Sequence, residues 1–226
     1  MSNTSMFDTL LELPLLKGAS RERIAEIVGA VKFHFVKFKA GDIIFSQGEL
    51  CTHLRFVLSG EVRVTFETDN LSISLGQTLT GPDVIAPEYL FGRETHYPSA
   101  AVALSDVSLI QIEKSDYLKI LSMDKVFLLN YLNYLSMNAQ KSASAIRMCE
   151  GDLRKRIAYV LLAQSQPTGK DVELRSQRKP LNVIFDCSTS DMKQALDSMH
   201  DSGLIEFSEN SIRIKYRRGL LEFFVS

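Results

Sequence analysis

The 226-residue sequence predicts an α+β protein, and three observations, taken in chain order, predict it. Short alternating stretches with turn residues about every eight to twelve positions fill residues 31–113 and favour an antiparallel sandwich or barrel. An apolar seam with 4-3-4 spacing follows in residues 125–148 and predicts one long helix. A capped helix at 188–201 and a hairpin at 204–216 then predict a second, mixed unit.

The strand region begins with VKFHFVKF, in which Val31, Phe33 and Phe35 share one face. The run LRFVLSGEVRVTFE (54–67) divides at a Ser-Gly turn and alternates again on its second half. Ahead of the strands, Ser20 is placed to cap a short amphipathic helix. These patterns predict a β-domain with a helical N-terminal extension.

The long helix carries two apolar stripes. One is a coiled-coil seam of about three heptads. From it we assign these residues to a dimer interface: Leu128, Leu132, Leu135, Ala139 and Ile146. The other stripe is aromatic, at Phe127, Tyr131 and Tyr134. A helix that packs only on its own barrel is one interpretation, but two stripes favour contact with the barrel and with a second copy, so we predict a homodimer.

Composition and charge bear on where the protein works. The opening residues lack a basic start followed by a long apolar run, so no signal peptide is expected, and no stretch of about eighteen apolar residues predicts a membrane span. Three widely separated cysteines suit a reducing cytoplasm. Residues 1–150 carry 14 Lys/Arg against 17 Asp/Glu, whereas residues 151–226 carry 12 against 10. This weak asymmetry favours an anionic partner for the C-terminal part.

No pattern in the sequence predicts an enzyme, a metal site or a cofactor. The four histidines form no His-x-His pair of the kind that barrel metal enzymes use. The cysteines are not clustered as an iron–sulfur site needs. A nucleophile elbow and a phosphate-cradling loop are also absent from the sequence.

The C-terminal unit has one regular and one irregular segment. In the regular one, Ser188 can cap a helix that Gly203 ends in the left-handed conformation. Its inward residues are Met192, Leu196 and Met199. The irregular segment is RKPLNVIFDC (178–187), where Pro180 fits only at a helix start and the residues after it prefer strands. Two alternatives stay open there, a trimmed helix or a local strand.

Two segments carry a resemblance to a known family. FKAGDIIFSQGELCTHLRFVLSGEVRV (38–64) has Gly-Asp, Gly-Glu and Leu-Ser-Gly-Glu-Val at its turns, and CSTSDMKQALDSMHDSGLIEFSENSIRI (187–214) is followed by RRGLLEFF. In these residues and in the order of its elements, the chain resembles the CRP/FNR family of bacterial transcription regulators. The resemblance implies an antiparallel jelly-roll sensory domain of the cyclic-nucleotide-binding type (1–124), a dimerisation helix with its hinge (125–150), and a winged helix-turn-helix DNA-binding domain (151–226).

The resemblance also implies that double-stranded DNA is the partner. Thr189 and Ser190 stand where the family usually places an Arg and a Glu, and Lys193 and Gln194 occupy the next outward turn, within reach of base edges. In the wing, Arg213 and Lys215 suit phosphate contacts. A charged edge that merely faces solvent is the alternative for the wing. The alternative for the whole chain is a dimer that has lost specific DNA reading and acts through protein contacts.

The family's effector pocket is altered in this sequence. Relatives that bind cyclic nucleotides use a Gly-Glu pair at a helix start and a nearby Arg. Here Ala86-Pro87 and Pro98-Ser99 stand at these places, so cyclic AMP is not the expected effector. The pocket residues that the resemblance assigns are Ala86, Pro87, Glu88, Tyr89, Leu90, Ser99, Ala100 and Tyr131. The pocket either takes a different, less anionic small molecule or is filled by its own side chains. Cyclic-nucleotide binding would require Arg93 or Lys32 as a substitute cation.

Overall fold

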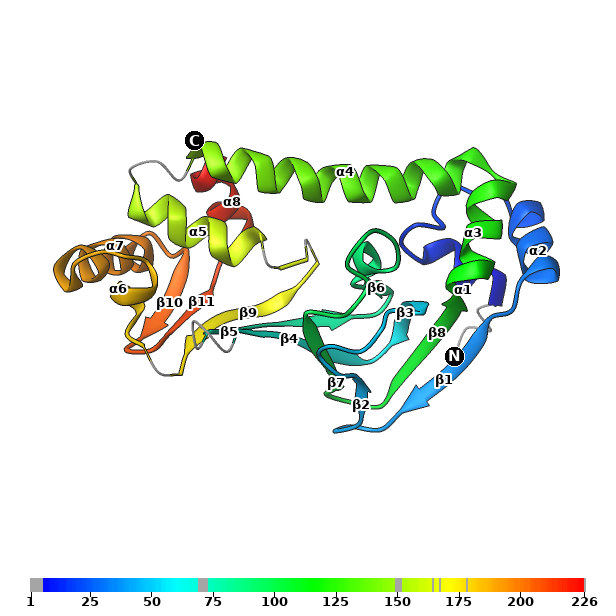
Figure 1. Ribbon diagram of the computed structural model, residues 1–226, viewed down its shortest axis with the longest axis horizontal. Helices are drawn as coiled ribbons and strands as arrows, with labels where there is room; N and C mark the ends of the chain where they lie inside the picture. The colour runs from blue at the N-terminus through cyan, green and yellow to red at the C-terminus, as the bar shows by residue number, and fades with distance from the viewer. Residues whose placement is uncertain are drawn as a thin grey trace. The chain divides into compact units, whose positions relative to one another are not determined.

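A computed structural model describes residues 6–68, 73–148, 152–163, 165–166, 168–177 and 179–225; the side chains of residues 6–7, 68, 73 and 141–148 lie outside that description. The chain divides into two compact units. The first comprises residues 1–63 and 79–137, and the second comprises residues 64–78 and 138–226. Figure 1 labels the elements of both units.

The first unit is an antiparallel β-roll with helices beside it (Figure 1). One sheet has the order β1-β8-β3-β6, and β2 pairs with β7 outside it. The helical elements are α1 (Met6–Glu12), α2 (Arg21–Ala30), η1 (Pro87–Tyr89), α3 (Lys114–Met123) and the first part of α4 (Lys125–Met148). The strands are β1 (His34–Phe38), β2 (Ile43–Phe45), β3 (His53–Ser59), the first residues of β4 (Glu61–Thr68), the last residues of β5 (Ile73–Thr80), β6 (Asp83–Ile85), β7 (Ser99–Ala103) and β8 (Val107–Glu113). The predicted antiparallel roll is confirmed.

The prediction that Val31, Phe33 and Phe35 share one face of a strand is wrong, because Val31 and Phe33 precede β1. Val31 belongs to the end of α2, where its N–H donates to the carbonyl of Ile27 at 3.0 Å, and β1 begins only at His34. Within β1, side chains change faces with a period of two, and Val36 and Phe38 take the inward positions. Phe35 is therefore 56% exposed, while Val36 and Phe38 are half-buried.

The second unit packs helices on a small antiparallel sheet. Within this unit the strand order is β10-β11-β9-β5-β4, because β5 pairs with the edge of β9. Its further elements are α5 (Leu153–Ala163), β9 (Lys170–Ser176), α6 (Leu181–Ile184), α7 (Thr189–Asp201), β10 (Ile205–Ser208), β11 (Ser211–Ile214) and α8 (Arg217–Val225). Leu75 of β5 is buried in the same core as Leu174 of β9, so β5 contributes to this unit's packing.

The irregular segment before α7 is a trimmed helix, and the strand alternative is wrong. Pro180 precedes α6, a single turn whose N–H groups at Val183 and Ile184 donate to the Pro180 carbonyl. Proline fits there because its missing N–H has no partner at a helix start. The guanidinium of Arg156 donates to the carbonyl of Phe185 and holds the end of the turn.

Helix α7 has the predicted ends. The hydroxyl of Ser188 accepts from the N–H of Asp191 at 3.0 Å, and Gly203 follows the helix at φ +70°. Met192, Leu196 and Met199 are buried as predicted. Among the residues that the structure describes, none of the helices combines the length and the apolar character that a membrane span needs.

Candidate functional site

The turn η1 (Pro87–Tyr89) contains three of the residues that the resemblance assigns to the effector pocket. Ala86 enters it in the left-handed conformation (φ 45°, ψ 48°), and Pro87 has no N–H to offer. The N–H groups of Tyr89 and Leu90 are already used: Tyr89 donates to the carbonyl of Ala86 and Leu90 to that of Pro87, both at 3.3 Å. An anion receptor at a helix start needs free N–H groups, and this turn supplies none at these positions.

Two tyrosines of α4 close the turn from the helix side. The hydroxyl of Tyr131 donates to the carbonyl of Pro87 at 3.0 Å, and the hydroxyl of Tyr134 donates to the carboxylate of Glu88 at 3.3 Å. Burial raises the pKa of Glu88, although the hydrogen bonds that it accepts act in the opposite direction. A carboxyl group that faces this turn would repel a bound phosphate.

The other predicted pocket residues surround the same turn or lie on β7. Leu90 is buried beside η1, and Tyr89 is half-buried with its pKa raised by burial. Ser99 is buried and Ala100 is half-buried, at the start of β7. Their assignment to an effector pocket stays a prediction. Tyr131 is the predicted member that the structure directly joins to η1.

Arg55, a cation inside the roll, was not among the predicted site residues. Arg55 lies on β3, and only 6% of its surface is exposed. Its guanidinium donates to the hydroxyl of Tyr97 at 2.5 Å and to the carboxylate of Glu49 at 3.3 Å. It also lies 5.4 Å from the ring centroids of both Phe45 and Tyr97, which stack on each other. The available signal was a single arginine in the otherwise apolar strand segment LRFVL.

Arg55 holds the roll together with groups of its own chain. Burial raises the pKa of Tyr97 against the opposing charge of Arg55, so the phenol stays protonated and its oxygen can accept the hydrogen bond. Burial likewise raises the pKa of Cys51, whose thiol contacts Tyr97 and is therefore unreactive at neutral pH. Within the described residues, the Nε of Arg55 has no hydrogen-bond partner. The cluster fills this part of the interior with protein side chains.

The cations proposed as substitutes for the missing arginine lie elsewhere. Arg93 and Lys32 are exposed. His96 is exposed as well and pairs with Glu94 at 2.8 Å in the loop before β7. Among the described residues, no three His, Cys, Asp or Glu side chains gather in a way that could hold a metal ion.

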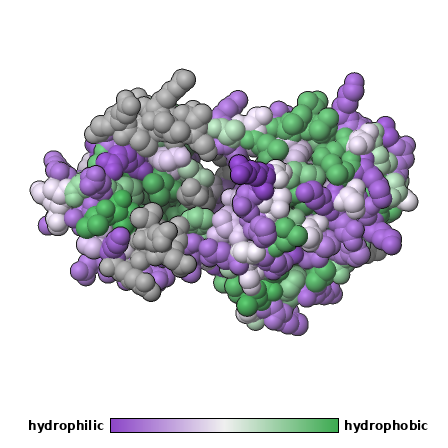
Figure 2. Space-filling view, viewed as in Figure 1, coloured by the Kyte–Doolittle hydropathy of each residue, from purple (hydrophilic) through white to green (hydrophobic). Residues whose placement is uncertain are grey.

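Helix α4 shows the two predicted stripes with different surroundings. The aromatic stripe faces the chain's own roll: Phe127 and Tyr131 are buried, and the rings of Tyr131 and Tyr117 meet edge to face at 5.6 Å. The leucine stripe faces outward, with Leu128 39% and Leu132 46% exposed. Hydrophobic surface is visible over the first part of α4 (Figure 2).

The C-terminal part of the predicted dimer seam comprises Leu135, Ala139 and Ile146. Leu135 is half-buried and Ala139 is exposed, whereas Ile146 lies where side chains are outside the description. Further apolar side chains extend the exposed surface of α4, at Leu129 and Met137. The dimer interface itself stays a prediction.

The predicted DNA-reading residues share an exposed face of α7. Thr189, Ser190, Lys193 and Gln194 are all exposed, while the opposite side of the helix is buried in the unit's core. Gln194 also lines a hollow of about 370 Å³ against the start of α5, beside Arg154. These side chains are therefore available to an external partner.

The wing cations are exposed but already paired with acids. Glu173 of β9 pairs with Arg175 at 3.1 Å and with Arg213 at 3.7 Å. Lys215 pairs with Glu206 at 3.7 Å across the hairpin. Each acid weakens the attraction that its cation would exert on a phosphate, and the sequence pattern did not indicate these pairs.

The roll, the long helix with an outward apolar stripe and the unit with a one-turn helix before α7 follow the element order that the resemblance implies. Residues 35–124 match the cyclic nucleotide-binding domain family. The chain is 23% identical over 204 residues to the "Cyclic AMP receptor protein" of Thermus thermophilus, covering 89% of this chain and 92% of that protein.

Solved structures with a similar fold support the same assignment. The catabolite activator protein of Thermus thermophilus is similar with a TM-score of 0.53 and 20% identity, over 94% of this chain and 98% of that one. The sensor domain of the transcriptional regulator DNR from Pseudomonas aeruginosa is similar with a TM-score of 0.51 and 20% identity, over 60% of this chain and 89% of that one. Both structures share the fold of this chain, and the matches to the cyclic nucleotide-binding domain family and to the cyclic AMP receptor protein agree with the resemblance to the CRP/FNR family.

Proposed function

We propose that this chain is a homodimeric, DNA-binding transcription regulator of the CRP/FNR type whose effector is not cyclic AMP. The exposed polar face of α7 is the single observation that carries the proposal. Thr189, Ser190, Lys193 and Gln194 offer hydroxyl, ammonium and amide groups, which can contact base edges or phosphates in a major groove. The buried opposite side of α7 fixes the helix in its unit, so the polar face is presented rigidly.

A dimer follows from the exposed leucine stripe of α4. A single chain leaves Leu128, Leu129 and Leu132 in water, and a second copy of the same stripe would bury them in a coiled-coil interface. Two-fold symmetry would then place two copies of α7 on successive turns of one DNA face. The relatives named as a cyclic AMP receptor protein and a catabolite activator protein support a regulatory role.

The η1 turn argues against cyclic AMP as the effector. Pro87 provides neither an N–H nor a carboxylate, its carbonyl is occupied by Tyr131, and Glu88 adds negative charge beside it. The buried cation of the roll, Arg55, is already bound by Tyr97 and Glu49. Losing charged hydrogen bonds of about 1.5–3 kcal/mol each reduces affinity by roughly tenfold or more per bond, so millimolar or weaker binding is expected.

Selection from a random duplex pool tests the proposal. Purified full-length protein is incubated with the pool at physiological salt, and the bound sequences should contain a palindrome whose half-sites lie about one helical turn apart. Replacing Thr189, Ser190, Lys193 and Gln194 together by alanine should abolish the enrichment. The variant Lys37→Ala removes one exposed cation of the first unit and should leave the enrichment intact. Specific binding that survives the quadruple replacement would show that α7 is not the reader.

The paired wing cations favour a second candidate function, a dimer that acts through protein contacts. Arg213 and Lys215 each lie next to a carboxylate, which lowers the positive potential of the hairpin. Under this alternative the selection returns no motif, with or without added cyclic AMP. Binding of any duplex would then be weak and equal for all sequences.

A further inference from the structure

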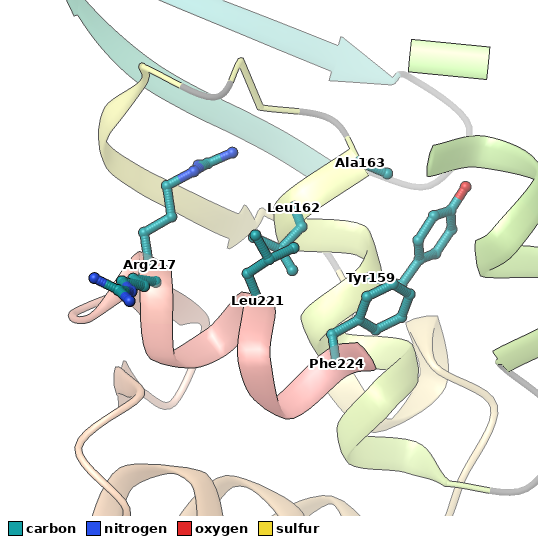
Figure 3. A pocket seen from close by; sticks show the side chains of 7 residues that line it. Tyr159, Leu162, Ala163, Arg217, Leu221 and Phe224 are labelled. Atoms are coloured by element: carbon teal, nitrogen blue, oxygen red, sulfur yellow. The ribbon is translucent and has the colours of Figure 1, made fainter. Parts of the chain in front are cut away.

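The second unit contains an apolar cavity that the proposed DNA-binding face does not use. It has a volume of about 370 Å³ and lies between α5 and α8. Tyr159, Leu162 and Ala163 of α5 form one wall, and Leu221 and Phe224 of α8 form the other (Figure 3). Its volume is at the lower end of the range of about 300–1,000 Å³ typical of small-molecule sites.

The walls are held by packing in the core of the unit. Phe224 stacks on Tyr159 with ring centroids 6.2 Å apart, and Leu162 and Phe224 are both mostly buried. Leu221, in contrast, is 47% exposed, so the cavity is reached from solvent on the α8 side. An apolar ligand that enters would therefore cover exposed surface without having to open the core.

A cation without an acidic partner stands at the rim of this cavity. The guanidinium of Arg217 donates to the hydroxyl of Ser165 at 2.8 Å and to its carbonyl at 3.3 Å. Within the described part of the chain no carboxylate pairs with Arg217, and burial lowers its pKa without an opposing acid. A guanidinium has five N–H donors, so the two bonds to Ser165 leave others for a ligand.

The neighbouring Arg218 differs in both respects. It is exposed and pairs with Glu222 at 3.0 Å one turn along α8. An exposed charge that already has a counter-ion contributes little to binding. Arg217 is therefore the group that favours a negatively charged ligand.

We propose that the cavity between α5 and α8 binds a small amphipathic monoanion, whose apolar chain lies between Tyr159, Leu162 and Leu221 and whose carboxylate pairs with Arg217. The apolar walls favour the hydrocarbon part of such a ligand. Arg217, which has no acidic partner among the described residues, favours an anionic head group. Guanidinium and carboxylate groups match in planar, two-point geometry, which favours a carboxylate over a neutral head. The inference concerns binding alone and holds whether or not the chain reads DNA.

Decanoate is a suitable probe because it combines a short apolar chain with one carboxylate. Titration calorimetry with the full-length protein, at probe concentrations below micelle formation, should give a dissociation constant on the order of 10–100 µM. Decyltrimethylammonium has the same chain with the opposite charge, and it should bind at least about tenfold more weakly. Equal binding of the two probes would refute selection by Arg217.

Three variants locate the site. Arg217→Gln should weaken decanoate binding by about 10- to 100-fold, since it removes a charge-assisted contact. Ala163→Leu fills the cavity and should weaken binding of either probe. Arg93→Gln removes an exposed arginine of the first unit and should leave binding unchanged. Thermal unfolding by circular dichroism, compared with the wild type, verifies that each variant is folded.

Each outcome of these titrations either supports the site or overturns the proposal. Loss of decanoate binding in folded Arg217→Gln and Ala163→Leu, with Arg93→Gln unaffected, supports the site. Wild-type affinity in either cavity variant would show that decanoate binds elsewhere and overturn the proposal. Absence of wild-type binding up to about 1 mM would also overturn it, and a change in sedimentation under those conditions would identify a second copy as the occupant.

Discussion

Replacing Glu173 by glutamine removes the carboxylate that pairs with two arginines, Arg175 and Arg213. The carboxylate of Glu173 lies 3.1 Å from Arg175 and 3.7 Å from Arg213. The amide of glutamine fits the same space but carries no charge, so both arginines become free to meet a phosphate. We expect Glu173→Gln to lower the stability of the second unit and to raise its affinity for DNA.

The two effects have different sizes. Both arginine side chains are about half exposed, and exposed ion pairs contribute about 0–1 kcal/mol each, so the loss of stability is at most about 2 kcal/mol. For DNA, each arginine that newly reaches a phosphate makes the slope of log K against log salt more negative by about 0.9. One such contact per protomer corresponds to a slope change of about 1.8 for a dimer. Relative to equal affinity of variant and wild type at 1 M salt, this slope change makes the variant bind roughly thirtyfold more tightly at 0.15 M salt.

Fluorescence anisotropy with a labelled duplex, repeated over a series of salt concentrations, measures both the affinity and the slope. Asp106→Asn is the matched control, because it frees Lys39 from an ion pair of 2.8 Å in the first unit and changes the net charge equally. The control should bind DNA as the wild type does. An unchanged slope in Glu173→Gln would refute the reasoning and show that Arg213 does not reach a phosphate.

Three further predictions concern the core, the η1 turn and the dimer. Met199 is 1% exposed, so Met199→Ala should lower the free energy of unfolding by about 2–5 kcal/mol in urea titrations, whereas Asp197→Ala on the exposed side of α7 should change it by less than about 0.5 kcal/mol. Burial raises the pKa of Glu88 above its unfolded value of 4.5, so the wild type loses stability as pH rises above that value. Glu88→Gln can still accept the hydrogen bond of Tyr134. This variant should unfold at a higher temperature than the wild type at about pH 8, and the difference should disappear toward about pH 5. Leu132→Lys should weaken self-association by at least about tenfold in sedimentation velocity, and a dimer of wild-type stability would remove Leu132 from the interface.

Local patterns were sufficient to predict α7 and the β10–β11 hairpin of the second unit. The helix at 188–201, its serine cap and its inward methionines follow from spacing and capping, which depend on neighbours in sequence. The segment after Pro180 was ambiguous for the same reason. The residues after Pro180 prefer strands, whereas Pro180 itself fits a helix start. The structure has a helical turn there, and Arg156, 29 residues away in sequence, donates a hydrogen bond to the carbonyl of Phe185 at its end.

The first strand shows where local pattern fails. Alternation predicts two faces, but it does not say at which residue the strand begins, and the cap of α2 moved the start of β1 to His34. Arg55 was missed for a related reason. A charge on an apolar strand is unusual, yet only the fold brings Tyr97 and Glu49 to its guanidinium.

The sequence by itself determined the order of the elements, the departure of the effector pocket from its relatives and the two stripes of α4, because periodicity and residue chemistry are local properties. The tertiary structure decided which charges are available. Glu173 and Arg213 are 40 residues apart, and antiparallel pairing of β9 with β11 sets them opposite each other. Ser165 and Arg217 meet only because α5 packs against α8. Ion pairs and cavities depend on distances between remote residues, and only the folded backbone fixes those distances.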